Sequence, residues 1–425
     1  MKIHIKNGHL IDPQNGTDAK QDIFIAAGKV VGVDVAPADF SANQTIDAEG
    51  LVVCPGLVDL SARLREPGFE YKATLESELQ AAAAGGVTSL ACPPDTDPVL
   101  DEPGLVEMLK HRAKLLNLAH VYPLGALTRQ LQGKNLTEMC ELAEAGCVGF
   151  SQADAPLTDT QVLWNAMQYA ATFGFTVWLR PEDAYLAKNG VAHNGEVAAR
   201  LGLQGIPASA EAIAIATILR LMKETGAKVH LCRLSTGEGV EMVRQAKQQG
   251  LAVSCDVAAT HVHLTEHDIG FFDSHCHLRP PLRTQRDKEA LRAGLLDGAV
   301  DAICSDHTPV DDDAKLATFA ESEVGASGLE LLLSLTLKWA TENKVGLSAA
   351  IARITNSPAA VMGINAGHLS VGATADVCVF DADAYYQVAA KTLKSQGKNT
   401  PFLGMELAGK VRYTLVAGQI VFYGG

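Results

Sequence analysis

The middle of the chain opens with a short stretch in which an apolar run gives way to charged residues: Asp59-Leu60-Ser61-Ala62-Arg63-Leu64-Arg65-Glu66-Pro67-Gly68. It closes the first of eight strand-like apolar runs, which are separated by amphipathic helical segments. The runs end near Leu60, Pro93, Leu124, Ser151, Arg180, Arg233, Val257 and Asp306. Strands that alternate with helices are typical of a parallel α/β fold, and eight of them predict a (β/α)8 TIM-type barrel over residues 55–365.

The two ends of the chain differ from the middle, because they consist of short strands and turns. Ile3 and Ile5 alternate with polar residues before a turn at Asn7-Gly8. A similar pattern of short apolar runs returns near the C-terminus. We therefore predict that residues 1–54 and 366–425 together form one small composite β-sandwich domain.

Local signals place several helices and loops within the middle part. Residues 210–223 carry apolar side chains at helical spacing, and Asp159 and Thr236 are suited to cap the helices that follow them. Residues 310–327 have little apolar content, which predicts a mobile, solvated loop at the barrel mouth. Residues 386–404 are expected to form an irregular excursion before the final strands.

Composition limits the classes of function open to the chain. With 425 residues, 47% of them hydrophobic, it can build one large core and a smaller second one. A formal net charge of −14 argues against nucleic acid or an anionic membrane as the main partner. Nine cysteines without C-x-x-C spacing indicate buried thiols in a reducing compartment. We find no leader-like or membrane-spanning apolar run and expect a soluble cytoplasmic protein.

Several separated motifs resemble those of the dihydroorotases, which are cyclic amidohydrolases of pyrimidine synthesis. The motifs follow the family's order along nearly the whole chain: Asn7-Gly8-His9-Leu10-Ile11-Asp12-Pro13, Pro55-Gly56-Leu57-Val58-Asp59-Leu60, Arg65-Glu66-Pro67-Gly68-Phe69-Glu70, Pro280-Pro281-Leu282-Arg283-Thr284, Ser305-Asp306-His307-Thr308-Pro309, Thr355-Asn356-Ser357-Pro358-Ala359 and Gly372-Ala373-Thr374-Ala375-Asp376. The resemblance implies the barrel of the amidohydrolase superfamily with a small β-sandwich domain.

The resemblance also implies where zinc would be bound, and most of the metal-binding side chains are missing there. Family members use histidines, a bridging acid or carbamylated lysine, and an aspartate at the last barrel strand that is also the general base. The positions of the lost ligands hold Ser61, Arg63, Gln152 or Ala153, Arg180 and Arg233. Asp306 alone survives, and Asp154 is out of register with the bridging acid. A hydroxyl is a poor zinc ligand and a guanidinium cannot be one, so we expect no zinc cofactor.

The substrate-binding positions that the resemblance implies are also changed. Arg65, which in the family grips the substrate carboxylate, remains. Asp95 and Arg279 stand where the family has asparagines, and Val310 stands where it has a histidine. We interpret these positions as a vestigial substrate pocket.

These losses favour a chain that is not an enzyme. Hydrolysis of a cyclic amide at neutral pH needs a metal-activated water and a stabilised oxyanion. The arginines that replace ligands are expected to fill the cavity, with Asp306 and Asp59 as their ion-pair partners, because buried carboxylates need compensation. The alternative is that these arginines point into solvent at an open mouth.

Two H-x-H pairs offer other metal donors, His261 with His263 and His275 with His277. The first pair falls in a segment where the family carries histidines outside its metal shell, so a structural role is favoured. The second pair has no acidic third ligand nearby and could bind metal only adventitiously. Neither pair lies at an expected strand end, which argues against a catalytic centre.

The resemblance narrows to non-catalytic dihydroorotase-like chains that assemble with the catalytic chain of aspartate carbamoyltransferase in some bacteria. It implies a structural subunit of a large hetero-oligomer, needed for assembly and activity of the transferase. Two alternatives stay open. One is a divergent but active dihydroorotase or related cyclic amidohydrolase that recruits metal through His261, His263 or Asp306. The other is an anion-binding module that uses Arg65 and the arginine-lined pocket.

Overall fold

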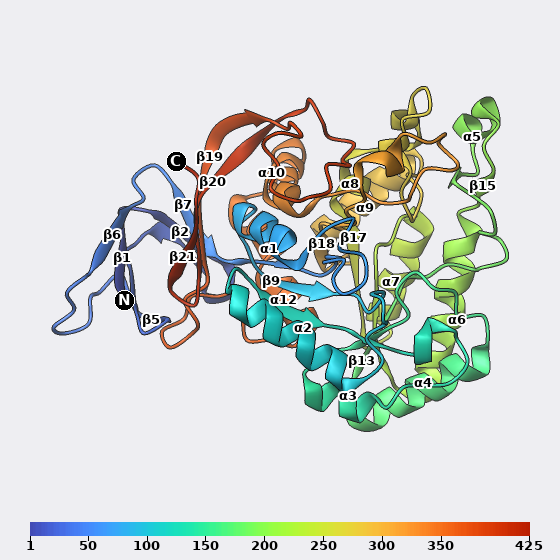
Figure 1. Cartoon of the computed structure of the whole chain (residues 1–425), viewed down its shortest axis with the longest axis horizontal. Helices are drawn as coiled ribbons and strands as arrows, with labels where there is room; N and C mark the ends of the chain where they lie inside the picture. Colours follow the sequence, from blue (N-terminus) through green and yellow to red (C-terminus); the bar gives the residue numbers. More distant parts are fainter.

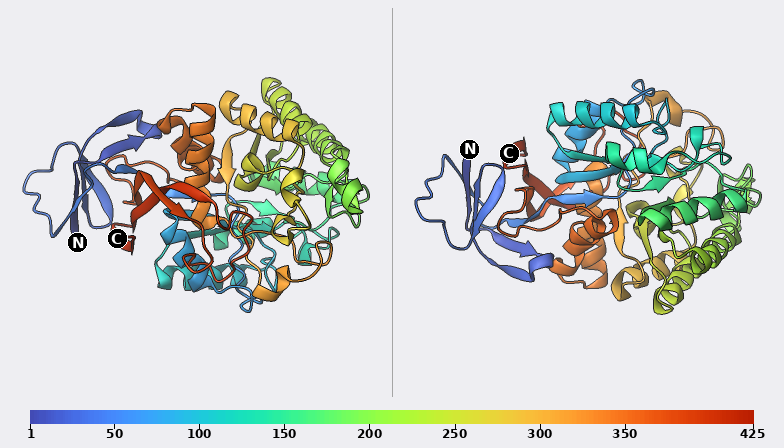
Figure 2. Two further views of the ribbon diagram at one scale, coloured as in Figure 1. Left: turned by 90° about the horizontal axis from the view of Figure 1, so that it is seen from above. Right: turned by 90° about the horizontal axis from the view of Figure 1, so that it is seen from below.

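The computed structural model describes residues 1–425 and shows a barrel beside a smaller β-rich part (Figure 1). Both termini lie in the β-rich part, and Figure 2 shows the same division from two further sides. None of the helices combines the length and the apolar character needed to span a bilayer.

The barrel is a ring of parallel strands. They are β8 (Leu57–Asp59), β9 (Val87–Cys92), β10 (His120–Pro123), β11 (Gly125–Ala126), β12 (Phe150–Ser151), β13 (Thr176–Leu179), β16 (Lys228–Leu231), β17 (Val253–Ala258) and β18 (Ala302–Cys304). Backbone hydrogen bonds close the ring beyond β18 and β8: His307 donates to Ser61 O, and Arg63 donates to His307 O, both at 2.9 Å. The predicted barrel is confirmed, and each strand ends within two residues of the predicted point.

Helices surround the ring and follow most of its strands (Figure 1). They are α1 (Leu75–Ala84), α2 (Pro103–Leu116), α3 (Met139–Ala145), α4 (Thr160–Phe173), α5 (Glu196–Leu201), α6 (Ser209–Thr225), α7 (Gly237–Gln248), α8 (Ala259–His263), α9 (Gln285–Asp297), α10 (Leu332–Asn343), α11 (Leu347–Ala352) and α12 (Asn356–Met362). The expected caps are confirmed, because Asp159 accepts from the first turn of α4 and Thr236 accepts from Gly239 N in α7.

The β-rich part consists of two sheets. The smaller sheet holds β1 (Lys2–Lys6), β4 (Ile23–Ala26), β5 (Lys29–Val33) and β6 (Gln44–Asp47). The larger sheet holds β2 (His9–Asp12), β3 (Thr17–Lys20), β7 (Val52–Pro55), β19 (Val377–Gln387), β20 (Glu406–Val416) and β21 (Gln419–Tyr423). Both chain ends contribute to the core that these strands share, with Ile3 and Ile25 from one end and Val377 and Leu415 from the other. The exact domain boundaries stay a prediction.

Two irregular segments pack against the barrel mouth. Between β19 and β20, Asn399 donates from its side-chain amide to Thr308 O and Gly325 O at 3.0 Å. The segment 310–327 buries Lys315 and Phe319, although all three residues between them are exposed. The segment expected to be a solvated loop is therefore anchored by buried side chains.

Side chains fill the interior of the barrel. The buried cluster there includes Leu60, Trp178, Ala258 and Ala302, which leaves no open channel between the strands. Because the interior is filled, the polar side chains that come directly after the strands lie at the carboxyl end of the barrel, where TIM-barrel sites are found.

Candidate functional site at the barrel mouth

A group of polar side chains follows the carboxyl ends of five barrel strands. Ser61 and Arg63 follow β8, Asp154 follows β12, Arg180 follows β13, Arg233 follows β16 and Asp306 follows β18. Arg233 and Asp306 have left-handed backbones, with φ of 56° and 48°. That conformation costs about 1–2 kcal/mol for a residue with a Cβ, so the contacts of these side chains have to compensate for it.

Asp154 is the centre of this group. Its Oδ1 accepts from Arg180 Nε and from Arg233 Nη2, both at 2.6 Å. Its Oδ2 accepts from Arg63 Nη2 at 2.7 Å. Burial works to raise the pKa of Asp154, but the charges of Arg233, Arg63 and Arg180 outweigh it and hold that pKa well below its usual value. Asp154 is therefore a carboxylate shared by three guanidinium groups.

Asp306 is the second carboxylate of the centre. Arg233 Nη1 donates to its Oδ1 at 2.9 Å, Arg63 Nη1 lies 3.6 Å from the same atom, and the Ser61 hydroxyl lies 3.4 Å from it. Burial raises the pKa of Asp306 by more than these arginines lower it. Arg180 makes no contact with Asp306 and pairs with Asp154 and Glu182 instead.

An outer layer of ion pairs completes the charge balance. Arg63 Nε donates to Asp95 Oδ2 at 2.7 Å, and Arg180 Nη1 lies 2.9 Å from Glu182 Oε2. Arg279 also pairs with Glu182. We call the resulting set the ion-pair cluster; its four arginines are Arg63, Arg180, Arg233 and Arg279, and its four carboxylates are Asp95, Asp154, Glu182 and Asp306. Equal numbers of opposite charges leave no free cation in the cluster for a bound anion.

Zinc does not fit the residues of this cluster. A guanidinium has no lone pair to offer a metal, and arginines occupy three of the positions that the family resemblance gives to ligands. Nowhere in the chain do three or more His, Cys, Asp or Glu side chains form a group that could hold a metal ion. Asp154 and Asp306 are already bridged by Arg233. The positive charge next to Asp154 and Asp306 is therefore provided by arginine side chains, at the place where the resemblance implies a zinc ion.

At the end of β12 the structure differs from the prediction. Gln152, at one of the expected ligand positions, makes no contact with the other members of the group: it accepts from the Thr128 hydroxyl at 2.9 Å and donates to Leu131 O at 2.8 Å. Ala153 has no polar side chain to contribute. The out-of-register Asp154 enters the cluster instead, because long arginine side chains reach it from the ends of three other strands, β8, β13 and β16.

The expected pairing of arginine with Asp59 is wrong. Asp59 is fully buried, and it accepts from the backbone N–H of Ser305 at 2.8 Å and from the Ser305 hydroxyl. Burial raises its pKa to about 6, which these hydrogen bonds only partly oppose. Asp59 is thus stabilised by neutral donors, outside the ion-pair cluster.

Comparisons with known proteins agree with the motifs. A family described as Dihydro-orotase-like matches residues 50–239, and one described as Amidohydrolase family matches residues 191–422. A Dihydroorotase-like protein of Pseudomonas aeruginosa is 45% identical over 424 residues, covering 100% of both chains. The chain belongs to the dihydroorotase-like family.

Other relatives of this dihydroorotase-like chain carry enzyme names. A protein named Dihydroorotase from a Geobacter species is 40% identical over 425 residues and is covered completely. An L-hydantoinase (dihydropyrimidinase) from Arthrobacter aurescens has a TM-score of 0.89 and 26% identity, covering 100% of this chain and 96% of that one. The prediction that the chain is not an enzyme is therefore wrong: it was based on a handful of side chains, whereas similarity to named enzymes extends over the whole chain.

Most of the positions that the resemblance assigns to substrate binding have contacts within the dihydroorotase-like chain itself. Asp95 and Arg279 belong to the ion-pair cluster, and Val310 is buried with its backbone N–H donating to Asn399 Oδ1 at 3.0 Å. Arg65 donates from Nε to Pro309 O at 2.8 Å, and no carboxylate pairs with it. Burial, and then the charge of Arg63, lowers the pKa of Arg65.

Both H-x-H pairs have structural partners. His261 Nε2 lies 3.1 Å from Pro280 O, and His263 Nε2 lies 2.8 Å from Leu335 O. His277 Nδ1 lies 2.9 Å from Ser322 O, while His275 contacts Asp273. Burial lowers the pKa of His261, His263 and His277 to about 4, so these three rings are neutral donors to carbonyl groups. The structural role favoured for the first pair agrees with these contacts.

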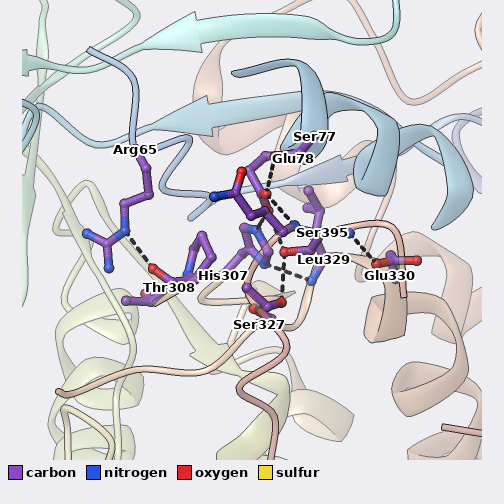
Figure 3. Close-up of polar contacts among 12 residues, drawn as sticks. Arg65, Ser77, Glu78, His307, Thr308, Ser327, Leu329, Glu330 and Ser395 are labelled. Carbon is purple, nitrogen blue, oxygen red and sulfur yellow. Dashed lines mark hydrogen bonds and ion pairs between the residues drawn. The ribbon is translucent and has the colours of Figure 1, made fainter. Parts of the chain in front are cut away.

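Sequence reasoning missed a second buried group next to the mouth, which Figure 3 shows. His307 Nε2 donates to Glu78 Oε2 at 2.5 Å, while its Nδ1 accepts from the N–H groups of Gly328 and Leu329. Glu78 also accepts from the Ser395 hydroxyl at 2.6 Å. The ring is therefore neutral with its proton on Nε2, and the group joins α1 to the segments after β18 and β19. A signal existed, since Glu78 lies on the buried face of α1 between apolar residues.

Proposed function

We propose that this dihydroorotase-like chain assembles with the catalytic chain of aspartate carbamoyltransferase in a large hetero-oligomer of pyrimidine synthesis. In that assembly it would support formation of the active transferase. The partner is the one that the motif resemblance implies, and the acidic net charge of −14 makes nucleic acid or an anionic membrane poor alternatives.

The observation that carries the proposal is the ion-pair cluster. Its arginines stand where family members hold zinc, and replacements of this kind are what the resemblance connects with transferase-associated chains. Charged side chains that are only 5% exposed and paired on several sides contribute shape and rigidity to a barrel mouth.

The cluster would give the assembly a mouth of fixed shape. Through Asp154, Arg63 connects the segment after β8 to the segment after β12. Through Asp306, Arg233 connects the segments after β16 and β18. A surface that is ordered before binding loses less conformational entropy when a partner docks. The mouth loops are then preformed without a metal, and we propose that the chain retains no zinc.

We also propose that the assembly works in the cytoplasm. All nine cysteines are free thiols, and seven of them are buried, which fits a reducing compartment.

Co-expression with the cognate transferase chain tests the proposal. We expect the two chains to co-purify at a fixed ratio, and the transferase expressed alone to be smaller and less active. Light scattering gives the mass, and a transferase assay at matched concentration gives the activity. An unrelated TIM-barrel protein in place of this chain is the control. A transferase that reaches the same mass and activity without this chain would contradict the proposal.

A second candidate function is hydrolysis of a cyclic amide such as dihydroorotate or hydantoin. The names of the relatives favour it, and so do Arg65 and Asp306, the two family side chains that remain at the mouth. The raised pKa of Asp306 moves that carboxyl toward the range useful for a general base.

An assay of the purified chain on dihydroorotate and on hydantoin, with and without added zinc, tests the second candidate. Asp306→Asn keeps the size of the side chain and removes the base, so it is the matched variant. Turnover that Asp306→Asn abolishes would support hydrolysis at this mouth. Turnover that survives this substitution would contradict it.

A further inference from the structure

Two neighbouring segments at the barrel mouth expose large apolar side chains. Phe271, in the segment after α8, is 90% exposed, and Leu316, in the segment after β18, is 80% exposed. Phe272 is 38% exposed and packs edge to face with Phe271, with the two ring centroids 5.4 Å apart. Phe271 and Leu316 are the two most exposed large apolar side chains of the chain, and aromatic residues are enriched at protein interfaces.

These side chains are held in place by the framework beneath them. The Ser274 hydroxyl donates to Lys315 O at 2.6 Å, and Lys315 Nζ donates back to Ser274 O at 3.0 Å. Lys315 is buried, and its ammonium group also contacts the carbonyl groups of His277 and Glu323. The two segments therefore form one unit, and the exposure of Phe271 and Leu316 belongs to a packed arrangement.

The surroundings of this apolar pair are acidic. Residues 266–277 and 311–323 carry five exposed carboxylates: Asp268, Asp273, Asp312, Asp313 and Glu321. They carry no exposed lysine or arginine, because the ammonium group of Lys315, their only lysine, is engaged by carbonyl groups. An apolar centre with a charged rim is the usual anatomy of a protein interface.

We infer that these two segments form a docking surface for a partner protein that presents a basic patch. The partner would cover Phe271, Phe272 and Leu316 with an apolar patch flanked by lysine or arginine side chains, because charge complementarity favours opposite signs across an interface. A second copy of this chain fits poorly, since pairing the surface with itself would bring like charges together. The inference rests on the proposed function, which supplies the partner: the transferase catalytic chain.

Substitution of the apolar centre tests the surface. The double variant Phe271→Ser with Leu316→Ser removes the two most exposed side chains without touching the ion-pair cluster. The control is Leu115→Ser with Leu296→Ser, whose side chains are 72% and 52% exposed near the C-terminal ends of α2 and α9. Equal melting temperatures of the two double variants and the wild type establish that all are folded.

Each variant is then co-expressed with the transferase chain, and affinity is measured by titration at low and high salt. We expect the surface variant to bind about tenfold or more weakly, the control to bind like the wild type, and salt to weaken the wild type. Asp312→Lys with Asp313→Lys should weaken binding and reduce its salt dependence. If the wild type binds the transferase chain and the surface variant binds it equally well, the docking surface is wrong but the proposed function stands. A wild type that does not bind would overturn the proposed function and the partner with it.

Discussion

Two groups of carboxylates lie next to each other at the barrel mouth, one partly buried and one fully buried, and the neighbouring residues Asp306 and His307 belong to one group each. Asp154 and Asp306 are paired with guanidinium groups, whereas Glu78 is surrounded by a neutral histidine, hydroxyl groups and a backbone N–H (Figure 3). Asp59 resembles Glu78, since Ser305 provides its donors. The first group stabilises its carboxylates with opposite charges, and the second stabilises them with uncharged hydrogen-bond donors.

The difference concerns what happens when one member is lost. Removing one charge from a buried ion pair leaves the other uncompensated, which costs about 3–5 kcal/mol. Removing one hydrogen bond to a buried carboxylate costs less, about 1.5–3 kcal/mol. The ion-pair cluster should therefore respond more strongly to single substitutions than the group around Glu78.

The largest effect is expected for Asp154→Asn. This substitution leaves Arg63, Arg180 and Arg233 facing one another without their shared charge, and it should lower the free energy of unfolding by about 4 kcal/mol. Solvent reaches Asp154, whose side chain is 33% exposed, so the effect should stay below the sum of three separate pairs. Urea unfolding at pH 7 measures it, with the exposed Asp313→Asn as control. Equal losses for the two variants would show that charge pairing is unimportant here.

The next effect is a pH dependence that belongs to Asp59. Its pKa is about 6 in the folded chain and about 4 when unfolded, so between these values the folded state binds more protons. Stability should therefore fall by up to about 3 kcal/mol as the pH rises through that window. Asp59→Asn can keep both bonds to Ser305 and should flatten this part of the curve. Denaturant unfolding from pH 4 to pH 7 measures this dependence. The assignment would be contradicted if the free energy of unfolding changed equally with pH in the wild type and in Asp59→Asn.

A smaller effect is expected for Glu78→Gln. Both carboxylate oxygens of Glu78 accept hydrogen bonds, whereas the glutamine amide has only one acceptor oxygen. At least one buried donor therefore loses its partner, and the free energy of unfolding should fall by about 2 kcal/mol. Because the Ser395 contact weakens, hydrogen exchange should speed up in the segment between β19 and β20. The control is Gln80→Glu, an exposed change on the same helix. A loss as large as that of Asp154→Asn would remove the distinction between the two groups.

The barrel could be predicted from the sequence because its signals are local. Apolar runs and helical spacing place each strand end within two residues, and Asp159 and Thr236 act on their own helix termini. The composition of each segment is sufficient for such features, since neighbours along the chain decide them.

The cluster could be predicted only in part, because its contacts depend on side-chain reach. Register along β12 pointed to Gln152 and Ala153, but arginines from β8, β13 and β16 converge on Asp154. The partner predicted for Asp59 was wrong for the same reason: Ser305, which follows β18, provides its hydrogen bonds, and no arginine pairs with it. Glu78 and His307 lie 229 positions apart, and only the closed ring brings them together.

The metal content of the purified chain tests most directly whether guanidinium charge has replaced a metal at the mouth. The chain is produced in zinc-supplemented cells, and its zinc is measured before and after chelation together with its melting temperature. We expect far less than stoichiometric zinc and the same melting temperature with and without chelator. Stoichiometric zinc whose removal lowers the melting temperature would contradict the account.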